Sequence, residues 1–205
     1  MPVDATAPDL RSEFARQWEQ ELQGLFDRMV TRWDNNPDDW SIRVTDQIGL
    51  LGKRTAVAFG RFVVDRFVQT NSARYEQRFR PEMMDPWIAE VSVNFGENIT
   101  GAFAERIEQD PDDAGGWMTG PGVGLFAGSL LNTFSNFGAH EGARASGGGQ
   151  KTWQVNSGNP RDTHSSLSGE TVTLSESFSN GMRWPGDPIG GAAEVANCQC
   201  SMTFV

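Results

Sequence analysis

The feature that most constrains this chain is an apolar residue at every fourth position from Trp87 to Ile107. The stripe consists of Trp87, Val91, Phe95, Ile99, Phe103 and Ile107. Only a helix brings residues four apart onto one face, because a strand sends alternate side chains to opposite faces. The spacing therefore predicts a helix over residues 84–109, ended by the turn-forming Asp110-Pro-Asp-Asp. We expect its side chains Trp87, Phe95, Ile99 and Phe103 to be largely buried.

The same kind of pattern predicts three more helices, so residues 9–145 should be mainly helical. Residues 9–34 repeat apolar side chains at steps of three and four, and residues 41–69 are apolar over much of their girth, which is typical of a central helix. A fourth helix is expected over residues 125–145. The glycine-rich residues 114–128 precede it. No Lys follows these glycines and no strand precedes them, so they indicate a flexible linker or a close backbone approach rather than a phosphate loop.

The pattern changes after Ser146-Gly-Gly-Gly-Gln150. Residues 171–174 and, more briefly, residues 153–155 have strand character, and Gly, Pro and Ser divide the remainder into short pieces. The predicted fold class is α+β, with an N-terminal helical region followed by a small, irregular, β-containing C-terminal module. The expected organisation is a helical domain at residues 1–145, a Gly-rich linker at 146–150 and the module at 151–205.

Charge and hydropathy exclude several function classes. The formal net charge is −10, of which −2 falls in residues 151–205 and −8 in residues 1–150. Broad binding to a phosphate backbone needs clustered Lys and Arg, so no broad nucleic-acid binding is expected, whereas contact with a basic protein surface is allowed. No apolar run reaches the length of about eighteen residues that a membrane span needs, and no signal peptide is evident. Most of the seven Trp should be core, with some exposed aromatics on the N-terminal helices for partner contact.

The last 55 residues contain a dense set of Trp, Arg, His, Gly, Pro, Asn and Cys that hydrophobic burial alone does not explain. We interpret them as a structural motif of packed polar contacts and special turns. Its residues are Trp153, Arg161, His164, Gly169, Pro185, Asp187, Glu194, Asn197, Cys198 and Cys200. Glu194 is the expected partner of Arg161 or His164. His164 should lie close to the segment from Glu194 to Cys200, because side-chain contacts must hold so irregular a module together.

These residues, in their order and spacing, resemble a known family. The matching motifs are Lys151-x-Trp153, Arg161-x-x-His164, Leu167-x-Gly169, Phe178, Pro185-Gly-Asp-Pro188 and Glu194-x-x-Asn197-Cys198-x-Cys200. They resemble the C-terminal domain of phage Mu F-like head morphogenesis proteins, which are minor capsid proteins of tailed bacteriophages. The resemblance covers about a quarter of the chain. The family more often has Arg where this chain has Gln199, and many of its members are much longer.

The resemblance implies a role in phage head assembly at the portal or inner capsid, and it implies no known reaction. The expected partner is the phage portal or major capsid protein. The expected location is the virion, with the host cytoplasm during assembly, and the resemblance leaves room for an oligomer in the virion. On this interpretation the protein is not an enzyme and has no catalytic residues. Two alternatives stay open: an enzyme or toxin-like effector packaged in the phage head, and a soluble protein-interaction domain unrelated to phage.

The residue types of the motif also permit two kinds of chemistry. His164, Cys198 and Cys200, with Asp162 or Glu194 as a fourth ligand, would form a mixed tetrahedral zinc set, although Cys-x-Cys is tighter than the usual Cys-x(2–4)-Cys spacing. We therefore expect no cofactor, with zinc as the weaker alternative. Either Cys with His164 would make a nucleophile and base pair, but hydroxyl-rich loops are common and no Gly-x-Ser-x-Gly elbow occurs. The other histidine, His140, is expected to face solvent on the fourth helix.

Overall fold

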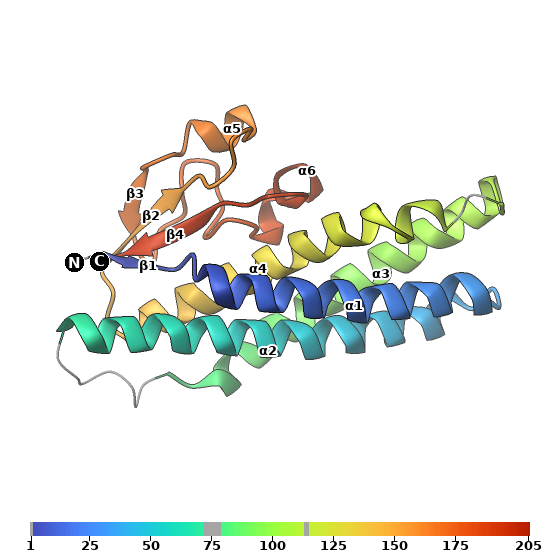
Figure 1. Cartoon of the computed structure of the whole chain (residues 1–205), viewed down its shortest axis with the longest axis horizontal. Helices are drawn as coiled ribbons and strands as arrows, with labels where there is room; N and C mark the ends of the chain where they lie inside the picture. The colour runs from blue at the N-terminus through green and yellow to red at the C-terminus, as the bar shows by residue number, and fades with distance from the viewer. Residues whose placement is uncertain (1, 72–78, 113–114) are drawn as a thin grey trace.

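Four long helices form most of the molecule, and a small sheet packs on them near the C-terminus (Figure 1). The structure is a computed structural model, and it describes residues 2–71, 79–112 and 115–205. The helices are α1 (Pro8–Arg32), α2 (Pro37–Asn71), α3 (Asp85–Gln109) and α4 (Pro121–Ala145). The predicted α+β class and all four predicted helices are confirmed. Among the described residues, no helix has both the length and the apolar character needed to cross a bilayer.

Prolines explain where three of these helices begin. Helices α1, α2 and α4 start at Pro8, Pro37 and Pro121. The first turn of a helix has no internal acceptor for its N–H groups, so proline loses nothing there and its fixed φ suits the helix. The sequence prediction placed the start of α2 four residues too late, because Pro37 was read as part of a turn. Likewise, residues 121–128 are helical and not a flexible linker.

The apolar stripe of α3 faces the core, but its members differ in burial. Ile99 and Phe103 are buried, whereas Trp87 and Phe95 are half-buried. The ring of Trp87 stacks on Phe137 of α4 with 3.8 Å between centroids. No aromatic side chain in the described parts of the chain is exposed, so the expectation of exposed aromatics for partner contact is wrong. The exposed large apolar residues are instead Val30, Ile42, Leu50, Met83, Val93, Leu125, Ile189 and Val205.

The sheet has four antiparallel strands in the order β1-β4-β2-β3. They are β1 (Val3–Asp4), β2 (Gln150–Gln154), β3 (Thr171–Thr173) and β4 (Ser201–Phe204). Strands β2 and β3 match the two predicted segments, whereas β1 and β4 were not predicted. Because Val3 pairs with Phe204, the two chain termini lie side by side (Figure 1). The N-terminal residues thus complete the sheet of the C-terminal module.

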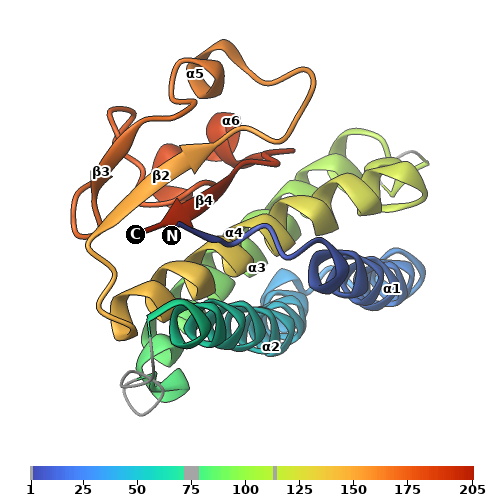
Figure 2. The same cartoon turned by 60° about the vertical axis from the view of Figure 1, so that its left-hand side comes forward.

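Short elements connect the long ones. They are the 3-10 helices η2 (Pro81–Met84), η3 (Gly116–Met118) and η4 (Pro188–Gly190), and the one-turn helices α5 (Asp162–Ser165) and α6 (Ala192–Val195). Figure 2 shows the sheet lying over α4, with α5 at the end of the module farthest from that helix. Helix α4 is therefore covered by other helices on one side and by the module on the other.

Helices α2 and α4 approach each other closely at glycines. A Cβ atom added at Gly138 would lie 2.6 Å from the Cα of Ala56, and one added at Gly142 would lie 3.0 Å from the Cα of Gly60. Both clashes are with main-chain atoms, which cannot rotate away. The two glycines, four residues apart on one face of α4, thus set the distance between the central helices.

This contact generates a stability prediction. Gly138→Ala should lower the free energy of unfolding by about 1–3 kcal/mol, because the added methyl overpacks the interface between the helices. Gly128→Ala, in the same helix but with open space around it, should leave stability unchanged or raise it by up to ~1 kcal/mol through helix propensity. Denaturant unfolding of both variants measures the difference. Equal midpoints for the two variants would contradict this packing.

Candidate functional site

The site is built from a one-turn helix and a reversed segment of main chain. Helix α5 supplies His164, and the segment between α6 and β4 supplies Cys198 and Cys200. Asn197 has a positive φ of 56° and reverses the chain just before the cysteines. Asparagine tolerates this left-handed conformation better than other side chains except glycine. The reversal turns Cys198 toward His164, and Cys200 follows at the entry to β4.

The three side chains form a compact buried cluster. The Nδ1 atom of His164 lies 3.7 Å from the Sγ of Cys198 and 3.6 Å from the Sγ of Cys200. His164 is only 2% exposed, Cys198 3% and Cys200 2%. The predicted proximity of His164 to the segment from Glu194 to Cys200 is confirmed. Because so little of either thiol is exposed, the arrangement does not favour a nucleophile and base pair.

Glu194 lies on the other side of the imidazole. Its Oε2 is 2.9 Å from the Nε2 of His164, at the distance of an ion pair but without hydrogen-bond geometry. The hydroxyl of Thr163 donates a hydrogen bond to the Glu194 carboxylate. Arg161, the other expected partner, instead donates to the main-chain carbonyls of Glu194 and Ala196. The Glu194 carboxylate therefore pairs with His164. The Arg161 guanidinium instead binds the main chain of the α6 segment.

The two thiols differ in acidity. The neighbouring Cys198 thiol, with a smaller contribution from His164, lowers the pKa of Cys200 to about 6, although burial opposes this shift. The neighbouring Cys200 and burial raise the pKa of Cys198 well above its usual range. The Trp153 ring also packs edge-on against His164, with 5.4 Å between ring centroids. The first proton lost from the reduced pair is therefore expected to come from Cys200.

Another part of the motif forms a turn that docks on α4. Asp187 is fully buried, and its carboxylate accepts hydrogen bonds from the main chain and guanidinium of Arg183. Gly186 has a positive φ of 81°, and a Cβ there would lie 3.2 Å from the backbone nitrogen of Thr133. The Thr133 hydroxyl donates to the Gly186 carbonyl at 2.9 Å. Pro185 lies next to this contact. The Pro-Gly-Asp turn is therefore the part of the motif that is hydrogen-bonded to α4.

Two remaining motif residues anchor the sheet. Gly169 donates its N–H to the Trp153 carbonyl. Its φ of 81° lies in the left-handed region that glycine adopts without strain. Lys151 is 1% exposed and donates to the Leu174 carbonyl at 3.0 Å. Burial lowers the pKa of Lys151 to about 8. Neither residue touches the His164 cluster by a polar contact, so their part in the motif is to hold β2 and β3.

Sequence reasoning missed the α4 side of this arrangement. The amide of Asn136 donates to the carbonyls of Pro185 and Cys200, each at 3.0 Å. His140 is 8% exposed and its Nε2 lies 3.0 Å from the Leu174 carbonyl oxygen, so the expectation that it faces solvent is wrong. The signal was a polar residue at every fourth position, Asn132, Asn136 and His140, on a helix otherwise lined with small and apolar side chains. A helix apolar on all sides is buried, and its polar residues then need partners.

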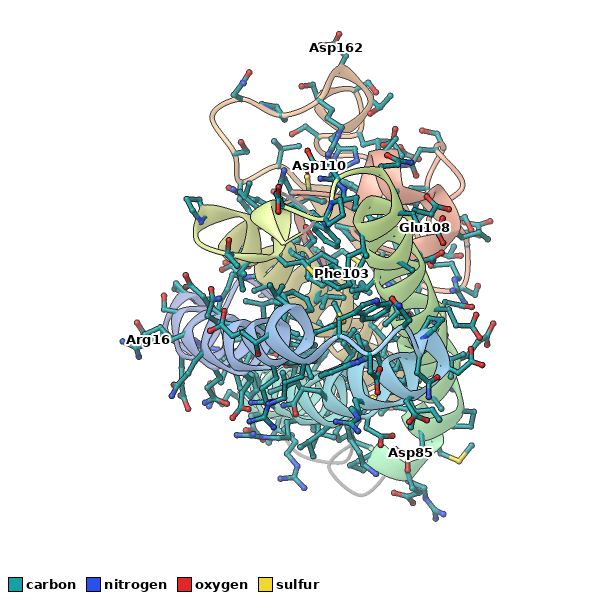
Figure 3. All side chains as sticks on the ribbon, turned by 90° about the vertical axis from the view of Figure 1, so that its right-hand side faces the viewer. Arg16, Asp85, Phe103, Glu108, Asp110 and Asp162 are labelled. Carbon is teal, nitrogen blue, oxygen red and sulfur yellow. The ribbon has the colours of Figure 1, made fainter. Side chains whose placement is uncertain are left out.

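Among the described residues, His164, Cys198 and Cys200 could hold a metal ion, since their donor atoms all lie within 4.8 Å of one another. Asp162, expected as a fourth ligand, is exposed and points away from the rest at the outer tip of the module (Figure 3). Comparison of the chain with known protein families, curated proteins and solved structures found no match.

The acidity of Cys200 can be tested by titration. In the reduced, metal-free protein, one thiolate should form with a pKa of about 6, detected by its ultraviolet absorbance. His164→Ala should raise that pKa, because the imidazole stabilises the thiolate electrostatically and by hydrogen bonding. Asp162→Asn should leave it unchanged. Two thiolates titrating together near the ordinary cysteine pKa would show that the pair does not share a proton.

Proposed function

We propose that this protein is a minor capsid protein of a tailed bacteriophage, acting in head morphogenesis at the portal or inner capsid. The observation that carries the proposal is that the motif residues behind the resemblance fold into one connected module. His164 meets Cys198 and Cys200, Asp187 closes the turn at Gly186, and that turn docks on α4. The residues thus have a structural role, which agrees with an assembly protein better than with an enzyme.

The helical region supports the same proposal through its surface. Its formal net charge of −8 over residues 1–150 suits contact with a basic protein surface. Ile42 and Leu50 on α2 are 60% and 57% exposed, and exposed apolar side chains of this kind can be buried in the core of a partner interface. The module meanwhile is held to α4 by hydrogen bonds, so such a partner would meet a rigid body.

The alternatives gain less from the structure. A packaged enzyme needs a nucleophile that a substrate can reach, and the two thiols are 3% and 2% exposed. An interaction domain unrelated to phage would use the same surface, and only its partner would differ. The partner therefore decides between the capsid proposal and the second alternative.

The experiment is co-assembly. The chain is expressed with the portal and major capsid genes of the phage or prophage that encodes it, and proheads are isolated by sedimentation. We expect the chain to copurify with proheads, to be lost when the portal gene is omitted if it binds the portal, and to remain if it binds the inner capsid. An unrelated acidic protein of similar size is the control for nonspecific packaging. Absence of the chain from both proheads and mature particles would refute the proposal.

A further inference from the structure

We propose that His164, Cys198 and Cys200 bind one zinc ion. This inference goes beyond the assembly role, because it assigns a specific ion to a cluster that the assembly proposal treats only as packing. The three donors are a neutral imidazole nitrogen and two sulfurs, a combination that suits zinc and disfavours hard ions such as magnesium and calcium. His164 comes from α5, and the two cysteines come from the segment entering β4. In sequence, Cys198 follows His164 by 34 residues and Cys200 follows it by 36.

The spacing of the donors fits tetrahedral zinc. With Zn–N and Zn–S bonds of about 2.0 and 2.3 Å, a tetrahedron places the nitrogen about 3.5 Å from each sulfur. The corresponding distances in the structure are 3.7 and 3.6 Å. An ion therefore enters between these atoms with shifts of a few tenths of an ångström. The left-handed conformation of Asn197 orients the Cys198 sulfur, and the start of β4 at Ser201 positions the Cys200 sulfur.

The surroundings supply the contacts that zinc ligands usually have. With Nδ1 facing the sulfurs, Nε2 of His164 faces the Glu194 carboxylate at 2.9 Å, so a metal on Nδ1 would leave the ring proton on Nε2, beside that carboxylate. Carboxylates beside a ligating histidine fix its tautomer and raise its basicity. Thr163 in turn donates to Glu194. The Trp153 indole N–H is buried with no hydrogen-bond partner among the described residues, and a metal-bound Cys200 thiolate would offer it an acceptor.

Charge balance also favours an ion here. Cys198 and Cys200 are only 3% and 2% exposed. Both can be thiolates only if a positive charge lies between them, because an unpaired buried charge is costly. Zinc with two thiolates and one neutral imidazole gives a neutral centre. Binding would release the cysteine protons, so zinc affinity should increase with pH.

The fourth position has a source of solvent. No other His, Cys, Asp or Glu in the described ranges joins the three donors. A cavity of about 490 Å³ borders Cys198 and is also lined by Arg11, Asn156 and Gln199. A water molecule from this cavity would complete the tetrahedron. The ion would thereby link α5 to the segment before β4. This link would stabilise a module that has only a small hydrophobic core.

The experiment uses the full chain, purified under reducing conditions, stripped with a chelator and titrated with Zn²⁺ and, separately, Co²⁺. We expect one ion per chain, and for cobalt the thiolate-to-metal charge-transfer bands and intense visible bands of tetrahedral coordination. The cobalt spectrum of the unmodified chain does not depend on whether a variant folds. Failure of the reduced, folded chain to bind either ion would overturn the proposal, as would recovery of Cys198 and Cys200 as a disulfide that takes up no zinc after reduction.

Three variants identify the ligands. Cys200→Ser should lose stoichiometric binding and, with it, the thiolate-to-cobalt charge-transfer bands. Glu194→Gln should keep one ion per chain but weaken zinc binding by about 10–100-fold, as expected for a residue that acts through the histidine. Asp162→Asn is the matched control, because it changes an exposed carboxylate on α5, the helix that also carries His164. This variant should bind zinc as tightly as the original chain does. Zinc that survives Cys200→Ser with unchanged affinity would place the ion elsewhere and refute the assignment.

Discussion

The rest of the structure depends on the hydrogen bonds that a polar row on α4 makes with the main chain of the C-terminal module. Asn136 lies at the centre of this row, and its side-chain amide is within 3.0 Å of the carbonyl oxygens of Pro185 and Cys200. A buried amide without partners costs more free energy than a typical hydrogen bond returns. The module supplies these two main-chain acceptors, and Asn132 of α4 itself supplies two further oxygens at 3.1 Å from the same amide nitrogen.

The same contact positions the metal-binding candidates. Cys200 accepts a hydrogen bond from Asn136 through its carbonyl and approaches His164 through its sulfur. Beside the row, the Thr133 hydroxyl donates a hydrogen bond to the Gly186 carbonyl, and Arg11 of α1 donates to Asn132 in the row. The N-terminal helix, the central helix and the cysteine segment thus form one hydrogen-bonded unit. This arrangement explains why a module with four short strands can keep an ordered interior.

Sequence reasoning found the elements that local patterns encode. The four-residue apolar step specified α3 to within a residue. The need for side-chain contacts to hold the irregular module together predicted that His164 lies near the cysteines, although more than thirty residues separate them. It missed what only long-range packing decides. Strand β1 is two residues long and exists only because β4 lies beside it. The burial of His140 depends on the module that covers α4, and its neighbours along the helix gave only an indirect signal.

The central claim, that Asn136 holds the cysteine segment against α4, is tested most directly by hydrogen exchange of the Asn136→Leu variant. Loss of two hydrogen bonds, each worth about 1 kcal/mol net, should raise amide exchange over residues 184–204 by about tenfold or more through local opening. The control variant Gln20→Leu, at an exposed amide side chain of α1, should leave exchange in that segment unchanged. Protection of residues 184–204 that is the same in both variants would contradict the account.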